Sequence, residues 1–169
     1  MEAKLQALLD EADIRRVHIR YCRGIDRMDW DLVRLCYHPD AIDRHGAYNG
    51  GVEGFIEWAA ELLPQFESTQ HFTGNQYVEV QGDVGFAEHY AQARHRTRPD
   101  GERPAMDWVV FIRYVDRMER RHGEWRIADR MVVLDSQRSD PVPDGQAPLE
   151  NSNVGRRGKE DPSYGYRIV

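Results

Sequence analysis

The hydrophobic pattern of this chain changes its period near the middle of the sequence. Up to residue 63, apolar residues recur at spacings of three and four, which is the period of an amphipathic helix. From residue 69 onward, apolar and polar residues alternate, which is the period of a half-buried strand. Helices followed by a run of strands indicate an α+β domain in which the helices pack on one face of a sheet.

Three helices are expected in the first part of the chain. An apolar stripe predicts one long helix over residues 5–28, or two helices joined near Asp10. Asp29 is a good N-cap for a short helix that follows it, and a third stripe over residues 52–63 ends at Pro64, which cannot continue a helix.

The strands are expected to form a four-strand antiparallel meander, with turns at Gly and Asp residues. Before the meander, Pro39 predicts a turn at residues 38–41, followed by a brief strand over residues 41–45 and a loop at residues 47–51. The meander strands are predicted within residues 69–83, 84–98, 105–119 and 124–135.

Residues 1–137 are therefore interpreted as one α+β domain. Residues 138–169 are rich in Pro, Gly, Asn and charged side chains, which predicts an extended or disordered tail, or one laid across a neighbouring subunit.

Composition excludes several classes of function. The net charge of −6, with both signs interspersed, is unsuited to a nucleic-acid partner, because phosphate binding needs clustered Lys and Arg. No apolar run is long enough to span a membrane and no apolar leader is present, so we expect no membrane partner and a cytoplasmic location. Cys22 and Cys36 lack the spacing of metal ligands, and reduced, buried thiols are expected.

Histidines share strand faces with small residues. In the second meander strand, alternation places His89 and His95 on one face with three alanines, Ala87, Ala91 and Ala93. Such a face leaves space for a pocket, although the opposite arrangement, with Phe86 and Tyr90 facing the core, fits the pattern equally well. In the first meander strand, the corresponding shared face is predicted to hold His71, Thr73, Asn75 and Tyr77.

The segment "YCRGIDRMDW" places Asp26 on the apolar side of a predicted helix, where a carboxylate needs a partner. With "TQHFTGN" and "HYAQARH" further along, it resembles the SnoaL-like family of the nuclear-transport-factor-2-like, or cystatin-like, superfamily. Relatives include scytalone dehydratase, hexachlorocyclohexane dehydrochlorinase and bile-acid 7α-dehydratases. The resemblance covers roughly residues 5–137 and implies a cone: a curved antiparallel sheet wrapped around N-terminal helices, enclosing an apolar pocket.

The resemblance also implies site residues. Asp26 and His71 match the elimination dyad of these relatives, Tyr21 and His95 match further catalytic positions, and Arg130 matches a pocket arginine. Aromatic side chains available to line the pocket are Tyr48, Phe55, Trp58, Trp108 and Phe111, although packing in the core would suit most of them equally. Val110 is also expected to contact the substrate.

Five positions depart from the family's polar sites. Ile25 and Arg44 stand where scytalone dehydratase has tyrosines, Trp108 and Val110 replace its Ser and Asn, and Tyr21 replaces the lysine of the dehydrochlorinase. No single relative's complete site is therefore present.

The function expected from these residues is that of a dehydratase, eliminase or isomerase. In such an enzyme His71 takes a proton from carbon and Asp26 stabilises the imidazolium that forms. Tyr21 or His95 then protonates the departing oxygen or polarises the carbonyl of the substrate. No cofactor is required by this scheme. A hydrophobic cyclic hydroxylated substrate, such as a steroid, polyketide or aromatic intermediate, would fit an apolar pocket. The resemblance also favours a homotrimer.

Three alternatives stay open. Without the resemblance, Asp26 could be a structural carboxylate that accepts backbone hydrogen bonds, and His71 could be a hydrogen-bonded histidine of the core. The ending "WRIADRMVVLD" also resembles the non-catalytic β subunits of ring-hydroxylating dioxygenases, and a pocket without catalysis would suit a small-molecule binding protein. Zinc is not expected, because the spacing of Asp26, His71, His89 and His95 fits no metal motif.

Overall fold

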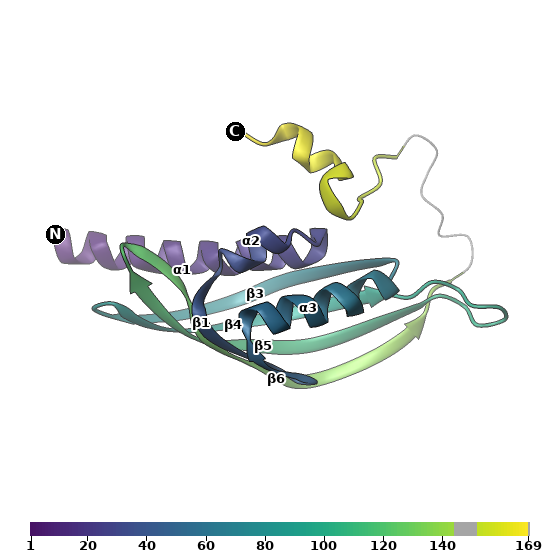
Figure 1. Ribbon diagram of the computed structural model, residues 1–169, viewed down its shortest axis with the longest axis horizontal. Helices are drawn as coiled ribbons and strands as arrows, with labels where there is room; N and C mark the ends of the chain where they lie inside the picture. Colours follow the sequence, from purple (N-terminus) through teal and green to yellow (C-terminus); the bar gives the residue numbers. More distant parts are fainter. Residues whose placement is uncertain (144–151, 169) are drawn as a thin grey trace.

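The computed structural model describes residues 1–143 and 152–168, in which a six-stranded sheet is covered on one side by helices (Figure 1). The helices are α1 (Glu2–Arg27), α2 (Trp30–Arg34) and α3 (Val52–Leu62), with 3-10 turns η1 (Leu63–Gln65), η2 (Gly158–Glu160) and η3 (Pro162–Tyr166). The strands are β1 (Tyr37–His45), β2 (Tyr48–Gly51), β3 (Ser68–Gln81), β4 (Val84–Arg96), β5 (Met106–Arg121) and β6 (Glu124–Pro141).

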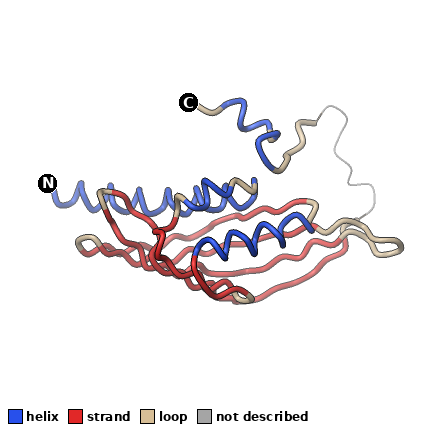
Figure 2. Tube along the Cα trace, in the orientation of Figure 1, coloured by secondary structure: helices blue, strands red, loops and turns tan. Residues whose placement is uncertain are grey.

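The strands form one curved, unclosed layer in the order β2-β1-β6-β5-β4-β3 (Figure 2). The predicted antiparallel meander is confirmed as β3 to β6. The prediction of a purely antiparallel sheet is wrong at one pairing, because β1 runs parallel to β6. Parallel neighbours need a long connection, and here α3 and four strands separate the two in sequence.

Two sequence predictions fail in β1 and β2. Residues 38–41, expected as a turn, lie within β1, and part of the expected loop at residues 47–51 forms β2. Pro39 is tolerated because the pairing with β6 shifts between Tyr37 and Ile42, so this stretch of β1 bulges away from the ladder.

Helix α1 is a single helix that packs its apolar side onto the sheet. It ends at Met28, which adopts φ 50° and donates its N–H to the carbonyl oxygens of Gly24 and Ile25. Gly24 permits the close approach of α2, because a Cβ there would lie 2.7 Å from Cγ2 of Val33. Asp29 caps α2 as predicted, accepting a hydrogen bond from the Leu32 N–H at 3.2 Å. This tight reversal holds the last turn of α1, which carries Asp26, against β3.

The two long strands differ in how far simple alternation describes them. In β4, His89 and His95 are buried, while Phe86 and Tyr90 are exposed, so the arrangement with the histidines facing inward is confirmed. In β3 the register shifts between Thr73 and Gln76, and Tyr77 lies 57% exposed, so the prediction that it shares the face of His71 is wrong. A bulge reverses the faces of all residues that follow it.

The chain beyond residue 137 contributes ordered structure. Strand β6 continues to Pro141, and the segment at residues 152–168 lies on the side of α1 and α2 that faces away from the sheet (Figure 1). It is attached there by hydrogen bonds such as that from the Tyr164 hydroxyl to Asp29, at 2.9 Å. The predicted tail at residues 138–169 also includes residues 144–151 and 169, which lie outside the described residues.

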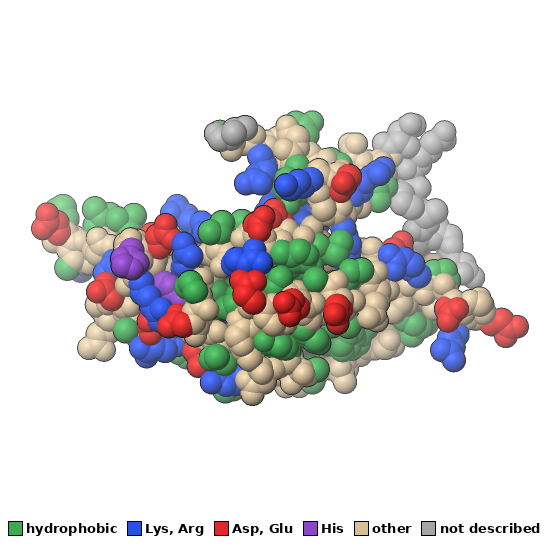
Figure 3. Space-filling view, in the orientation of Figure 1, with side chains coloured by type: hydrophobic (Ala, Val, Ile, Leu, Met, Phe, Trp, Pro, Cys, Tyr) green, Lys and Arg blue, Asp and Glu red, His purple; other side chains and the backbone are tan. Residues whose placement is uncertain are grey.

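The surface carries charged side chains of both signs, with hydrophobic side chains gathered in the middle of the face in Figure 3. Among the described helices, none has the length and apolar composition that crossing a membrane requires.

Candidate functional site

A cavity of about 470 Å³ lies between the helices and the inner face of the sheet, a volume typical of small-molecule sites. Its wall is mostly apolar and aromatic. The residues that line it are Tyr21, Ile25, His45, Gly46, Ala47, Phe55, Trp58, Ala59, Leu62, Leu63, His71, Ala93, His95, Trp108, Val110, Ile112, Tyr114, Val132, Leu134 and Gln137.

Asp26 and His71 form a closely bonded pair at the edge of this cavity. Nδ1 of His71 lies 2.8 Å from Oδ1 of Asp26, and the His71 backbone N–H donates to Oδ2 at 2.9 Å. The hydroxyl of Thr69 donates to Oδ1 at 3.0 Å, so the carboxylate is fixed from three sides. With Nδ1 engaged, Nε2 is the nitrogen of His71 that remains for a ligand.

The carboxyl group of Asp26 is charged at neutral pH. Burial alone would raise its pKa, but the hydrogen bonds and charge of His71, together with the Thr69 hydroxyl, hold the pKa below its ordinary value. A buried carboxylate of this kind stabilises an imidazolium, so the pair can accept a proton from a ligand.

His95 lies beside the pair without a carboxylate of its own. Its ring centroid is 5.7 Å from that of His71 and 5.1 Å from that of Trp108. Burial, reinforced by the nearby His71, lowers the pKa of His95 to about 4, so its ring is neutral at pH 7. Its Nδ1 is buried and has no hydrogen-bond partner among the described residues.

Tyr21 lines the inner end of the cavity, but Arg130 lies behind it. Arg130 is fully buried, its guanidinium hydrogen-bonds to both oxygens of Asp116 at 2.8 and 2.6 Å, and it does not line the cavity. Its carbon Cζ lies 4.2 Å from the ring centroid of Tyr21 and 4.5 Å from that of Tyr114. Arg130 was predicted to contact the substrate. It instead packs against the rings of the two tyrosines, on the side away from the cavity.

The other predicted lining residues divide in the same way. Phe55, Trp58, Trp108 and Val110 line the cavity. Tyr48 does not; its ring packs 6.0 Å from those of Phe55 and Trp58, and its hydroxyl donates to the carbonyl of Gly51 at 2.6 Å. Phe111, which follows Val110 on β5, points away from the cavity by alternation.

Several polar residues near the cavity were missed from the sequence. His45 lines it and pairs with the fully buried Asp43, and Tyr114 lines it with a hydroxyl that has no partner among the described residues. The alternation in "AIDRH" already placed Asp43 and His45 on one face, which was the available signal.

A second buried cluster lies deeper in the core. One possible ligand atom each from His18, His89 and Asp116 lies within 4.8 Å of the others. The two imidazole rings are stacked with centroids 3.8 Å apart, and Arg130 occupies both oxygens of Asp116. This arrangement is a packed polar core rather than an open metal site.

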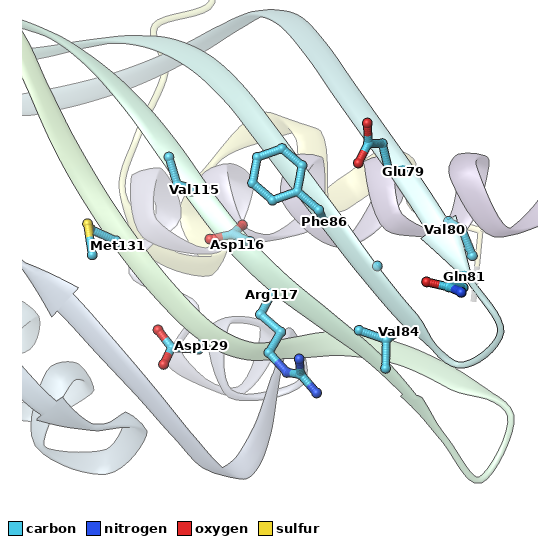
Figure 4. Close-up of a pocket in the computed structure, with 11 residues that line it drawn as sticks. Glu79, Val80, Gln81, Val84, Phe86, Val115, Asp116, Arg117, Asp129 and Met131 are labelled. Carbon is cyan, nitrogen blue, oxygen red and sulfur yellow. The ribbon is translucent and has the colours of Figure 1, made fainter.

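The outer face of the sheet carries a larger hollow of about 660 Å³ (Figure 4). Exposed side chains such as Phe86, Met131 and Arg117 surround it. It is open and contains no bonded histidine–carboxylate pair, so the inner cavity is the better candidate for chemistry.

Fold and site together define a class: an α+β cone whose apolar cavity holds a buried aspartate–histidine pair. The sequence matches the SnoaL-like domain family over residues 6–131, and the chain belongs to this family. A comparison with curated proteins finds no significant match.

Solved structures share the fold at low sequence identity. A hexachlorocyclohexane dehydrochlorinase, LinA type 2, is 19% identical with a TM-score of 0.72, over 84% of this chain and 99% of its own. A Novosphingobium aromaticivorans protein provisionally named a scytalone dehydratase is 18% identical with a TM-score of 0.69, over 83% and 97%. Another protein of that organism, provisionally named an aromatic ring hydroxylase, is 18% identical with a TM-score of 0.68, over 79% and 94%.

The geometry of the pair predicts a tautomer. In neutral His71 the proton is expected on Nδ1, because Asp26 accepts it there, so Nε2 keeps its lone pair toward the cavity. Nitrogen NMR shifts of the His71 ring in the free protein measure this. Asp26→Leu, which removes the acceptor, should abolish the preference, and a wild-type ring protonated on Nε2 would contradict the assignment.

The buried histidines predict how stability depends on pH. Burial, helped by the charge of Arg130, lowers the pKa of His89 to about 3. Between pH 6.5 and about 3 the unfolded chain binds a proton that native His89 does not, so stability falls as pH falls. Each such histidine contributes a slope of about 1.4 kcal/mol per pH unit.

Urea unfolding of His89→Gln at pH 7, 6 and 5 should therefore give a shallower pH slope than the wild type. His122→Asn is the matched control, since His122 is exposed in a turn and its replacement should leave the slope unchanged. Equal slopes for all three proteins would show that His89 is not buried in its neutral form.

Proposed function

We propose that this protein is a cofactor-independent lyase that removes water, or another leaving group, from a hydrophobic cyclic hydroxylated substrate such as a steroid, polyketide or aromatic intermediate. The observation that carries the proposal is the Asp26–His71 pair, bonded at 2.8 Å, at the edge of an apolar cavity of about 470 Å³. An isomerase would use the same first step.

In the proposed reaction His71 is the base. Its Nε2 takes a proton from carbon next to a carbonyl, and the charge of Asp26 stabilises the imidazolium that forms. The low exposure of both side chains, 5% for His71 and 12% for Asp26, strengthens this interaction because little water screens it.

Tyr21 and His95 are proposed to orient the oxygen of the substrate. Burial raises the pKa of Tyr21 well above its ordinary value, with Arg130 only partly offsetting the rise, so the phenol stays protonated. His95 is neutral at pH 7 because burial lowers its pKa to about 4. Both side chains line the cavity and can donate hydrogen bonds to a carbonyl or hydroxyl oxygen.

A second candidate is a non-catalytic subunit of a ring-hydroxylating dioxygenase, favoured by the likeness to the provisionally named aromatic ring hydroxylase. Such a subunit, like a simple binding protein, has no need of a buried carboxylate held by three hydrogen bonds, one of them to an imidazole that lines the cavity. Burying a charged carboxylate costs free energy. The lyase proposal gives Asp26 a role that explains this cost, and the subunit proposal gives it none.

Replacement of the base tests the proposal on a panel of cyclic hydroxy ketones. His71→Gln should lower kcat by about 100-fold or more, the range typical of general base catalysis, and Asp26→Asn should lower it in the same direction. His122→Asn is the control: it replaces an exposed histidine far from the cavity, so its kcat should equal that of the wild type. Full turnover by His71→Gln would remove the dyad mechanism, and no turnover by the wild type on any member would favour the subunit or binding function.

The oligomeric state separates the candidates without a substrate. We propose a homotrimer whose contacts include the outer face of the sheet, where Phe86, Tyr90 and Met131 are 40%, 47% and 47% exposed. Light scattering should give three times the 19.7 kDa of one chain, and Phe86→Arg should lower the mass. Ile19→Arg, a change of an exposed apolar residue on α1, should not. A monomer that associates only with an iron-binding partner would favour the subunit.

A further inference from the structure

The cavity contains a second histidine–carboxylate pair that the proposed base chemistry does not use. His45 is the last residue of β1, and its Nδ1 lies 3.2 Å from Oδ1 of Asp43. The Tyr37 hydroxyl donates to the other carboxylate oxygen, Oδ2, at 2.6 Å. Asp43 is fully buried, while His45 lines the cavity, so the carboxylate is hidden behind the imidazole as Asp26 is behind His71.

The two pairs lie on different walls of the cavity. His45 comes from β1 and His71 from β3, and three strands, β6, β5 and β4, lie between these in the sheet. The neighbours also differ: the His45 ring lies 5.0 Å from Phe55 and 5.8 Å from Trp58, whereas the His71 ring lies beside His95. A ligand that fills the cavity therefore meets the two imidazoles at different atoms.

A charged carboxylate lies behind His45. Burial alone would raise the pKa of Asp43, but the hydrogen bond and charge of His45, with Arg130 and Tyr37 behind, hold it below its ordinary value. Asp43 is thus a charged carboxylate that can balance an imidazolium. His95 has no such partner, so His45 and His71 are the two histidines lining this cavity that have a carboxylate on Nδ1.

We propose that His45 is a second catalytic residue, the general acid that protonates the leaving oxygen, and that Asp43 is its positioning residue. The inference rests on the proposed function and narrows its substrate class: an apolar ring compound with an acidic C–H that reaches His71 and a hydroxyl group that reaches His45. Nδ1 of His45 is held by Asp43, so Nε2–H is the proton that it donates.

The proposed step is balanced within the protein and the substrate. His71 takes the proton from carbon, the electrons of that C–H bond form the C=C bond, and the C–O bond breaks. The departing oxygen takes the proton of His45 and leaves as water. His71 ends protonated and His45 neutral, and proton exchange with solvent restores both.

The leaving group supplies the test, because chloride departs without a proton and hydroxide does not. On a hydroxy ketone that the wild type dehydrates, His45→Gln should lower kcat about 100-fold. On the matching chloride, or acetate where the chloride is not a substrate, His45→Gln should lower kcat less than about threefold, whereas His71→Gln should be slow on both. Asp43→Asn should follow the pattern of His45→Gln if it folds; His45→Gln carries the test if it does not.

The outcomes separate the two proposals. Turnover by the wild type with equal slowing of His45→Gln on both leaving groups, or with no slowing on the alcohol, would overturn the role of His45 and leave the lyase intact. Failure of the wild type on every alcohol, chloride and acetate would overturn the lyase itself, and the role of His45 with it. Thermal unfolding of His45→Gln, compared with the wild type, checks that the variant is folded.

Discussion

A buried ion pair between Arg130 and Asp116 supports the inner end of the cavity. Removing two charges from water costs several kcal/mol per ion, which only a well-formed pair with additional partners offsets. Here the guanidinium makes two hydrogen bonds to the carboxylate and lies against the rings of Tyr21 and Tyr114. Because these tyrosines line the cavity, the ion pair in the core fixes the surface that a ligand meets.

The same arginine begins a chain of hydrogen bonds that reaches the cavity. Arg130 donates to the Tyr37 hydroxyl at 3.3 Å, Tyr37 donates to Asp43, and Asp43 pairs with His45. The positive charge of Arg130 disfavours protonation of its histidine neighbours in the core and favours the ionised form of Asp43. The charge of Arg130 thus helps to keep the core histidines neutral and Asp43 ionised. A neutral histidine suits the buried core, and an ionised carboxylate suits a position behind His45.

The sequence indicated those parts of the site that depend on local periodicity. Helical spacing placed Asp26 toward the core, and alternation grouped His89 correctly with the other inner residues of β4, because neither requires knowledge of a neighbouring strand. Alternation left open which face of β4 is turned toward the core. The failures come from tertiary pairing: the bulge that accommodates Pro39, the register shift that exposes Tyr77, and the parallel pairing of β1 with β6 are set by strand neighbours. The position of Arg130 also could not be predicted, because a matching residue type does not say whether a side chain reaches the cavity or stops behind it.

The three histidines of the cavity show how environment rather than residue type assigns roles. His71 and His45 each have a carboxylate on Nδ1, which fixes the ring and can balance an added proton. His95 is buried against Phe66 and Trp108, and burial keeps it neutral. Two of these imidazoles therefore have a carboxylate that holds the ring, and the third offers a neutral hydrogen bond. In the proposed elimination, a ligand with two reactive positions on one apolar framework would meet one carboxylate-held imidazole at each position.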